Sequence, residues 1–165
     1  MLVLNDKYVG MVKRLIEMAK LKIDLCQFKI DSAGIAGNGA VSQLLVTLVK
    51  KAEEGIKVRV LLDCILPLRG RSANNTFVAL WMKKRGVQVR YLPANRCQHA
   101  KVVLVDGAHA VVGSHNWTLN SLLRNEEASI YFTNMEMICD VEGEFQLQFD
   151  RGMEYGMKQL GEIKV

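Results

Sequence analysis

Apolar residues recur along the chain at two spacings, one typical of helices and one typical of strands. Helical spacing predicts helices over 5–20, 41–54 and 76–86, and the second and third end on glycines. A last amphipathic helix carries an apolar stripe made of Ile138, Val141, Phe145, Phe149 and Met153. Short apolar or alternating runs predict strands at 22–30, 57–65, 87–92 and 128–133.

Two more strands flank Asp106-Gly107, a dipeptide strongly favoured in β-hairpin turns. Alternating strands and helices followed by a hairpin predict an α/β fold, in which helices cover both faces of a mixed sheet. Linkers, low-complexity segments and internal repeats are missing from the sequence. We therefore expect one domain that spans residues 1–165.

The hairpin pattern also brings polar side chains together. A two-residue turn at Asp106-Gly107 predicts three cross-strand pairs, Leu104 with His109, Lys101 with Val112 and His99 with Ser114. Because side chains alternate along a strand, His99, Lys101 and Ser114 are expected on one face, with Asn116 just past the strand end. His109 is expected on the other face.

This combination of side chains suits a particular chemistry. An imidazole can act as nucleophile or base, while an ammonium, a hydroxyl and an amide can hold an oxyanion such as phosphate. An edge hairpin with solvated polar residues is the simpler alternative. The apolar opposite face, with Ala100, Val102 and Leu104, favours a built site.

Composition narrows the partners. The 165 residues are half apolar and about a quarter charged, which is ordinary globular composition, and the net charge of +5 favours an anionic partner. No apolar run is long enough to cross a bilayer, and the N-terminus shows no signal-peptide pattern, so we expect a cytoplasmic protein. Four scattered cysteines and three histidines predict neither a disulfide framework nor a metal cluster.

The polar cluster matches a known pattern. His99-x-Lys101-x4-Asp106, followed by Gly113-Ser114-x-Asn116, resembles the H-x-K-x4-D…G-S-x-N signature of the phospholipase D superfamily. Downstream, Asn125-x-Glu127 resembles the family's N-x-E. The resemblance covers nearly all of the chain and implies a phospholipase D/nuclease-like fold, similar to the family's small single-motif nucleases.

Many members of that family carry two such motifs, but this chain has one. His109 is followed two residues later by Val111, and His115 by Trp117, so neither begins a second H-x-K. The family's chemistry needs two motif histidines in one site. The resemblance therefore implies a homodimer whose active site lies at its two-fold interface.

The resemblance also implies roles for the residues. His99 of one subunit would form a phosphohistidine, and His99 of the other would act as acid and base. The other assignments are Lys101 and Asn116 as ligands of the phosphoryl oxygens, Ser114 as their support, Glu127 as the group that orients His99, and Asp106 and Gly113 as structural residues. The mechanism requires no metal and no cofactor.

The substrate is less closely defined. The net charge and the basic loop residues Arg69, Arg71 and Arg96 favour DNA or RNA, with single strands preferred. Trp117 is a candidate for stacking on a base, with core packing as its alternative. The alternative functions are hydrolysis of an anionic phospholipid such as cardiolipin, and a non-catalytic nucleic-acid-binding module.

Overall fold

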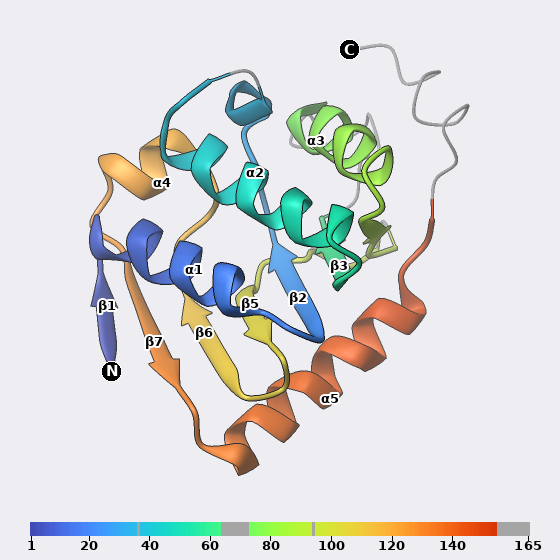
Figure 1. Cartoon of the computed structure of the whole chain (residues 1–165). Coiled ribbons are helices and arrows are strands. Elements are labelled where there is room, and N and C mark those ends of the chain that lie inside the picture. The colour runs from blue at the N-terminus through green and yellow to red at the C-terminus, as the bar shows by residue number, and fades with distance from the viewer. Residues whose placement is uncertain (36, 64–72, 94, 155–165) are drawn as a thin grey trace.

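A seven-stranded mixed sheet runs through the middle of the molecule (Figure 1). The computed structural model describes residues 1–35, 37–63, 73–93 and 95–154. The strands lie in the order β1-β7-β6-β5-β2-β3-β4. Their bounds are β1 Leu2–Leu4, β2 Lys22–Gln27, β3 Lys57–Leu62, β4 Gln88–Tyr91, β5 Lys101–Val105, β6 His109–Gly113 and β7 Ala128–Phe132.

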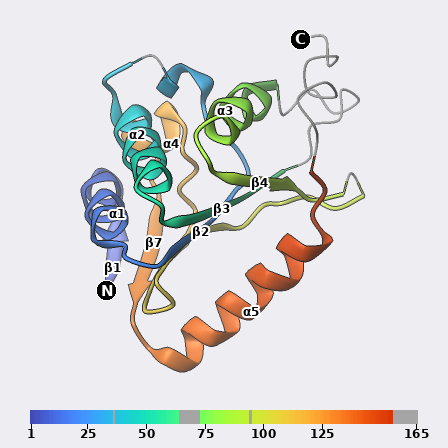
Figure 2. The ribbon, with the colours of Figure 1, turned by 45° about the vertical axis from the view of Figure 1, so that its right-hand side comes forward.

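Helices cover both faces of the sheet, as the sequence pattern predicts. Figure 2 shows α1, α2, α3 and α4 on one side of the sheet and the long α5 on the other. Their bounds are α1 Lys7–Met18, α2 Ala40–Glu53, α3 Ala73–Lys83, α4 Leu119–Leu123 and α5 Met135–Arg151, with a short 3₁₀ helix at Ser32–Ile35. Within the described ranges, no helix has the length and apolar character needed to span a membrane.

The sheet combines two kinds of strand pairing. β2, β3 and β4 run parallel, connected through α2 and α3, whereas β5, β6, β7 and β1 pair antiparallel. The side chains of Val103, Val105 and Val111 pack into the core beneath α1 and α2. Those of Val102 and Leu104 point the other way, toward α5. A strand buried on both faces explains why "KVVLV" reads as a continuous apolar run.

Several element boundaries differ from the predicted ones. β1 and α4 were not predicted, because runs of three and five residues are too short to show a period. The α5 helix ends at Arg151, so Met153 is not part of its apolar stripe. Met153 instead forms an isolated β-bridge with Tyr91, the last residue of β4. The predicted strand over 22–30 ends at Gln27, and Ile30 makes an isolated bridge to Trp117.

A buried ion pair joins α5 to the sheet. The guanidinium of Arg59 on β3 donates two hydrogen bonds to Asp24 on β2, at 2.6 and 2.7 Å, and a third to Gln146 on α5 at 2.6 Å. The same guanidinium lies 4.9 Å from the ring centre of Phe145 and 5.2 Å from that of Phe149. Because Asp24 neutralises the charge and the two rings enclose it, a cation can be buried under this helix.

The hairpin turn forms at the predicted place, but its register is not the predicted one. Asp106 and Gly107 have φ values of 56° and 63°, and the Ala108 N–H donates to the Val105 carbonyl at 3.0 Å. Ala108 is left out of the ladder, so Val105 pairs with His109. One unpaired residue shifts every later pair by one position.

The shift corrects the predicted pairs. Leu104 lies opposite Ala110, and Lys101 lies opposite Gly113 instead of Val112, so the ladder ends before His99 can face Ser114. The prediction that His109 points to the other face is also wrong, since it pairs with Val105 on the face of Lys101. His109 is separated from Lys101 by the length of the strand, and its Nδ1 lies 2.9 Å from the Tyr131 hydroxyl.

The Asp106 side chain connects the hairpin turn to another part of the chain. Its carboxylate accepts hydrogen bonds from the backbone N–H groups of Lys20, Leu21 and Lys22, at 2.8 to 2.9 Å. Burial alone would raise the pKa of Asp106, but these three bonds outweigh it and the pKa is lowered. The hairpin is thereby tied to the loop that enters β2.

Candidate active site

An exposed histidine and a buried lysine meet at the start of β5. Lys101 is 6% exposed, and its Nζ lies 3.2 Å from His99 Nδ1 and donates to the His99 carbonyl at 2.6 Å. Burial lowers the pKa of Lys101, while the nearby negative charge of Glu127 partly offsets that effect. The cation is thus held in place behind an imidazole that is open to solvent.

The segment that leads into β5 is held by its own glutamine. The Gln98 N–H donates to Asp63 at 2.8 Å, and the Gln98 side chain accepts from the Ala100 N–H at 2.9 Å. The same side chain donates to Gln148 on α5, at 2.8 Å. Asp63, just after β3, and Gln148 on α5 therefore help to fix the backbone on both sides of His99.

Phe28 forms the wall beside the two motif residues. Its ring centre lies 5.0 Å from the His99 ring and 5.5 Å from Lys101 Nζ. Asn75 on α3 is completely buried and holds this loop by donating to the Phe28 carbonyl at 2.9 Å and accepting from the Ile30 N–H at 3.0 Å. Sequence reasoning missed Phe28, because its position is set by residues distant along the chain.

Glu127 is the centre of a second polar group. It accepts hydrogen bonds from the Ser114 hydroxyl, from Ser121 at 2.6 Å and from Asn125 at 3.1 Å. Burial would raise the pKa of Glu127, but these donors outweigh it and the pKa is lowered. This carboxylate, with its lowered pKa, stands close enough to act on the charge of Lys101.

Asn116 is positioned through its backbone. Its N–H donates to the Ser121 hydroxyl at 2.9 Å, while Gln27 donates to the His115 carbonyl at 3.5 Å and accepts from the Trp117 N–H at 3.2 Å. The Asn116 Oδ1 is buried and has no hydrogen-bond partner among the described residues. The side chain as a whole is half-buried.

Gly113 is required by the close approach of β7. A Cβ at this position would lie 2.2 Å from Ser129 Oγ and 2.4 Å from the Ala128 carbonyl oxygen. No side chain can occupy that space. The glycine before Ser114 in the signature therefore has a steric cause in this chain.

The remaining predicted residues are not gathered at the site. Trp117 is completely buried, and its Nε1–H donates to the Tyr8 hydroxyl at 3.3 Å. It is a core residue and cannot stack on a base, which corrects the substrate-binding role proposed for it. Arg69 and Arg71 lie outside the described residues.

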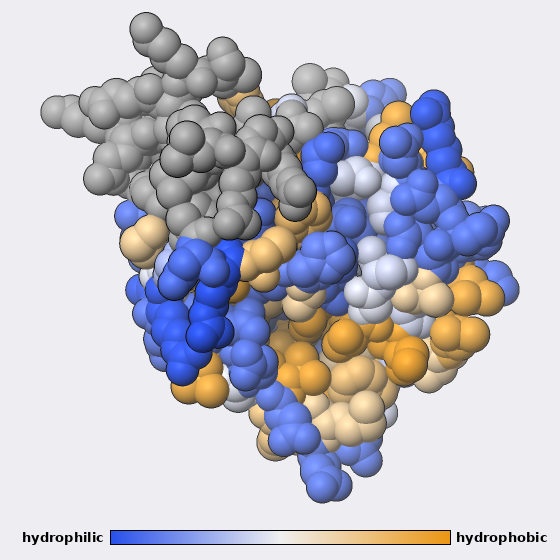
Figure 3. Space-filling model, turned by 180° about the vertical axis from the view of Figure 1, so that it is seen from behind, coloured by the Kyte–Doolittle hydropathy of each residue, from blue (hydrophilic) through white to orange (hydrophobic). Residues whose placement is uncertain are grey.

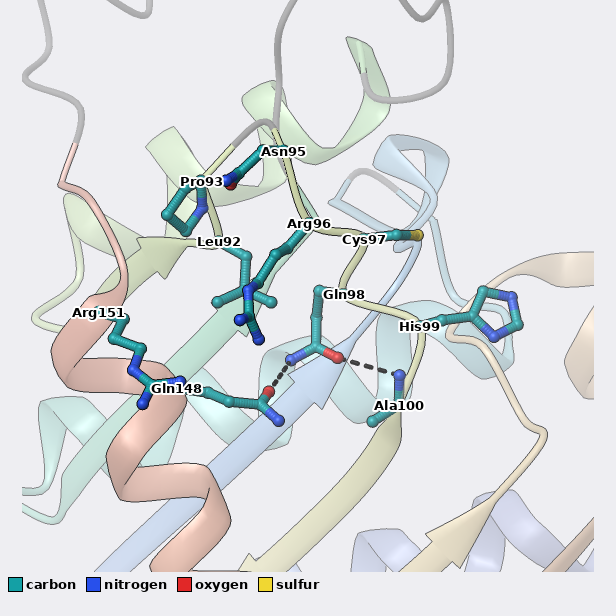
Figure 4. A pocket seen from close by; sticks show the side chains of 10 residues that line it. All are labelled: Leu92, Pro93, Asn95, Arg96, Cys97, Gln98, His99, Ala100, Gln148 and Arg151. Carbon is teal, nitrogen blue, oxygen red and sulfur yellow. Dashed lines mark hydrogen bonds between the residues drawn. The ribbon is translucent and has the colours of Figure 1, made fainter.

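Arg96 lines a pocket next to the motif strand, between the segment 92–100 and the end of α5 (Figure 4). The pocket has a volume of about 740 Å³, and Arg151 and Gln148 of α5 form its other wall. Figure 4 shows Arg96 and Gln98 extending toward Gln148, while the His99 ring points the other way. Arg151 comes from a distant helix, so no local sequence signal marked it.

Among the described residues, no group of three or more His, Cys, Asp or Glu side chains is arranged to hold a metal ion. The polar groups at the site are instead an imidazole, an ammonium, hydroxyls and an amide, which are donors suited to phosphate oxygens.

Solved structures of known proteins share the fold. Nuc from Salmonella typhimurium, a phospholipase D family member, superposes with a TM-score of 0.77 at 18% identity, covering 94% of this chain and 97% of that one. NucT from Helicobacter pylori gives a TM-score of 0.72 at 17% identity, covering 94% of this chain and 99% of that one.

Sequence comparison identifies further relatives. The human (Homo sapiens) protein named mitochondrial cardiolipin hydrolase is 31% identical over 123 residues, which are 74% of this chain and 43% of that protein. The mouse (Mus musculus) protein of the same name is 28% identical over 134 residues, 81% of this chain and 54% of that protein. The chain thus spans about half the length of the curated relatives it matches.

The family match covers most of the chain. Residues 12–148 match the family described as "Cardiolipin synthase, PLD-like domain". That range contains the whole signature from His99 to Asn116 and also Glu127. The chain belongs to this phospholipase D-like family.

Proposed function

We propose that this protein is a metal-independent phosphodiesterase that cleaves nucleic acid, preferably single strands, through a phosphohistidine at a site shared by two copies of the chain. The observation that carries the proposal is the pairing of an exposed His99 imidazole with the buried Lys101 ammonium, 3.2 Å from Nδ1 to Nζ. Family membership supports the same chemistry.

In the first step, His99 of one copy attacks the phosphorus of the phosphodiester. A P–N bond forms, the P–O bond to the leaving group breaks, and the partner's His99 donates a proton to the leaving oxygen. Lys101 and Asn116 hold the non-bridging oxygens, where negative charge grows in the transition state.

In the second step, water attacks the phosphorus of the phosphohistidine. The partner's His99, now neutral, takes a proton from the water as the P–O bond forms and the P–N bond breaks. The first imidazole must be neutral to attack, while the partner's imidazole must be protonated in the first step and neutral in the second. His99 is regenerated when the phosphate product leaves.

Ser114 and Glu127 support this machinery. Within one copy, Glu127 is bound to Ser114, Ser121 and Asn125, and the structure gives no hydrogen bond between Glu127 and His99 among the described residues. Its action on Lys101 is electrostatic. We therefore propose that Glu127 sets the charge of the site and holds Ser114, and that any contact with an imidazole is made in the dimer.

The second copy has a candidate docking surface. We define the uncovered sheet face as the apolar side chains that α5 leaves exposed or half-exposed on β1, β6 and β7, namely Leu2, Leu4, Val112, Ile130 and Phe132. Figure 3 shows apolar side chains gathered on this side of the molecule. Ile130 on β7 is 53% exposed, and Leu2, its partner on the edge strand β1, is 60% exposed, so two paired aliphatic side chains are open to solvent.

The strands that carry this face also lead to residues of the site. Leu4 pairs with Ala128, the residue after Glu127, and Val112 directly precedes Gly113 and Ser114. The Lys101 side chain lies on the opposite side of the sheet, the side of Val103 and Val105. A single motif needs a second copy of the chain to supply the second imidazole.

The substrate is proposed from the charge around the site. Arg96 and Arg151 line the pocket that flanks the His99 segment, and both are exposed. Two guanidinium groups beside a phosphodiester site suit a polymer with several phosphates. The net charge of +5 likewise favours an anionic polymer as substrate.

Hydrolysis of an anionic phospholipid is the second candidate. The observation that favours it is the 31% identity to a protein named mitochondrial cardiolipin hydrolase. The chemistry at the phosphorus would be the same, and only the groups attached to the phosphate differ.

The test compares substrates in the presence of a chelator. Purified protein is incubated with labelled single-stranded DNA, RNA, duplex DNA and vesicles of cardiolipin in phosphatidylcholine, beside His99→Ala and His109→Ala variants. We expect cleavage of single strands that persists in the chelator, is lost in His99→Ala and survives in His109→Ala. Turnover of lipid alone supports the second candidate, and no turnover of any substrate overturns the proposal.

A further inference from the structure

The segment after β6 directs alternate side chains inward and outward. Ser114 is exposed and Asn116 is half-buried, whereas His115 and Trp117 between and after them are completely buried. His115 therefore lies between Ser114 and Asn116 in the chain. Because the backbone is continuous, the contacts that hold the His115 side chain also affect the positions of these two neighbours.

His115 is held from two sides. Its ring stacks on Tyr8 of α1, with ring centres 4.2 Å apart and an interplanar angle of 11°. Its Nδ1 lies 2.7 Å from Ser129 Oγ on β7. The Tyr8 hydroxyl in turn accepts from Trp117 Nε1 at 3.3 Å, so one tyrosine anchors both inward side chains.

The Ser129 contact explains the space at Gly113. The Ser129 hydroxyl lies 2.2 Å from the point that a Cβ of Gly113 would occupy. Ser129 thus reaches across the glycine toward His115, two residues further along. The Ser129 hydroxyl on β7 thus lies against both Gly113, at the end of β6, and His115, just after β6.

The surroundings of His115 favour its uncharged form. Its ring is completely buried, and burial lowers the pKa of His115. A backbone contact with Asn5 and the negative charge of Glu127 partly offset this effect of burial on the pKa. The other titratable group against the ring is Tyr8, whose pKa is raised by burial and which is therefore neutral.

We infer that His115 is a positioning residue of the proposed phosphodiesterase site, which, as a neutral imidazole bonded to Ser129 and stacked on Tyr8, sets the positions of Ser114 and Asn116. The inference rests on the proposed function. His115 touches no substrate and acts only through its two chain neighbours. Tertiary structure alone reveals this role, because the position between Ser114 and Asn116 carries no requirement in the G-S-x-N pattern.

The test uses His115→Phe, which keeps a stacking ring and loses the bond to Ser129, together with Ser129→Ala and the double variant. His109→Phe is the matched control, because His109 also stacks on a tyrosine and bonds a hydroxyl, at the far end of the same strand. We expect kcat to fall about 10-fold in His115→Phe and KM to rise, since a displaced Asn116 loses contact with the phosphate oxygens of the bound substrate as well as of the transition state.

The double variant separates positioning from general damage. His115→Phe and Ser129→Ala each delete the same hydrogen bond. We therefore expect the double variant to lose no more activity than His115→Phe alone. Unchanged kcat in His115→Phe overturns the inference, as does a loss that follows the fraction of unfolded protein in thermal melts. His109→Phe is expected to keep the kcat of the unaltered protein.

A second measurement does not depend on turnover. Inorganic phosphate is titrated while the Asn116 side-chain amide is followed by NMR, and we expect about 10-fold weaker binding in His115→Phe than in His109→Phe. Equal affinities overturn the inference even if the protein cleaves phosphodiesters. If the unaltered protein neither binds phosphate nor turns over any substrate, the proposed function fails and the inference fails with it.

Discussion

At the scale of single residues, Gly113 is the most restricted position near the site. The Cβ of an alanine would lie 2.4 Å from both the Ala128 carbonyl oxygen and Ser129 Cα, which are backbone atoms that cannot turn aside. We expect Gly113→Ala to lower the free energy of unfolding by about 1–3 kcal/mol. Urea unfolding measures this.

The control for that prediction is Gly143→Ala. Gly143 lies on the exposed side of α5, where a Cβ would meet nothing within 4 Å. Alanine in a helix is favoured over glycine by about 1 kcal/mol, so this variant should be more stable than the unaltered protein. A Gly113→Ala variant that unfolds at the same urea concentration as the unaltered protein would contradict the steric argument.

Asp106 provides a prediction about pH. Its pKa is lower in the folded chain than the value of about 3.9 in an unfolded chain, so the unfolded state binds more protons as the pH falls. Its contribution to stability is therefore present above about pH 4 and is lost on further acidification. Asp106→Asn keeps the preference for a left-handed turn and removes the charge.

We expect Asp106→Asn to lower the free energy of unfolding at pH 7 by about 1–2 kcal/mol and to flatten its dependence on pH below about pH 4. Urea unfolding at a series of pH values tests this. Asp140→Asn, which removes an exposed carboxylate of α5, is the matched control. Asp140→Asn should lose stability with acid as steeply as the unaltered protein, and the same steepness in Asp106→Asn would contradict this role of the Asp106 carboxylate.

At the scale of elements, the attachment of α5 depends on a buried charge. Arg59 is 6% exposed and Asp24 is 1% exposed, so removing the carboxylate leaves an unpaired buried cation. We expect Asp24→Ala to cost about 3–5 kcal/mol. Adding Arg59→Met should recover part of this loss, because it removes the unpaired charge while keeping an apolar stem under Phe145.

Chemical unfolding measures the stabilities, and hydrogen exchange along α5 shows whether the helix has loosened. Full additivity of the two substitutions would mean that Asp24 and Arg59 do not act on one another. A cost under about 1 kcal/mol for Asp24→Ala would place the pair among ordinary surface ion pairs.

At the scale of the whole molecule, the shared site predicts how mixtures behave. If one site needs His99 from both copies, a mixed dimer of unaltered and His99→Ala chains is inactive. When the two are unfolded and refolded together, activity should follow the square of the unaltered fraction. A linear dependence would mean that each chain works alone, and mixing with His109→Ala should cause no loss.

The uncovered sheet face predicts where dimers can be broken. Ile130→Lys should give a monomer in analytical ultracentrifugation and lose activity, because it places a charge within the apolar interface. Phe77→Lys on α3 is the matched control, since Phe77 is 51% exposed on the opposite side of the sheet. Ile130→Lys chains that remain dimeric would exclude this face as the interface.

Local pattern was sufficient to predict much of this fold and site. Period-2 and period-3.6 spacing identified most strands and helices, because each side of those elements meets one environment along its length. The pairing of His99 with Lys101 followed from their spacing of two residues, and the turn role of Asp106 from its place before a glycine. All of these depend on neighbours in sequence.

Other features could not be read in this way. Leaving Ala108 out of the ladder changes the hairpin register by one, and the inward direction of His115 and Trp117 depends on a tyrosine more than 100 residues away. One partner of Glu127, Ser121, likewise comes from a helix too short to show a period. Residue spacing thus indicates which chemical groups are present, but burial and long-range contacts decide which of them face the substrate and which hold the site from behind.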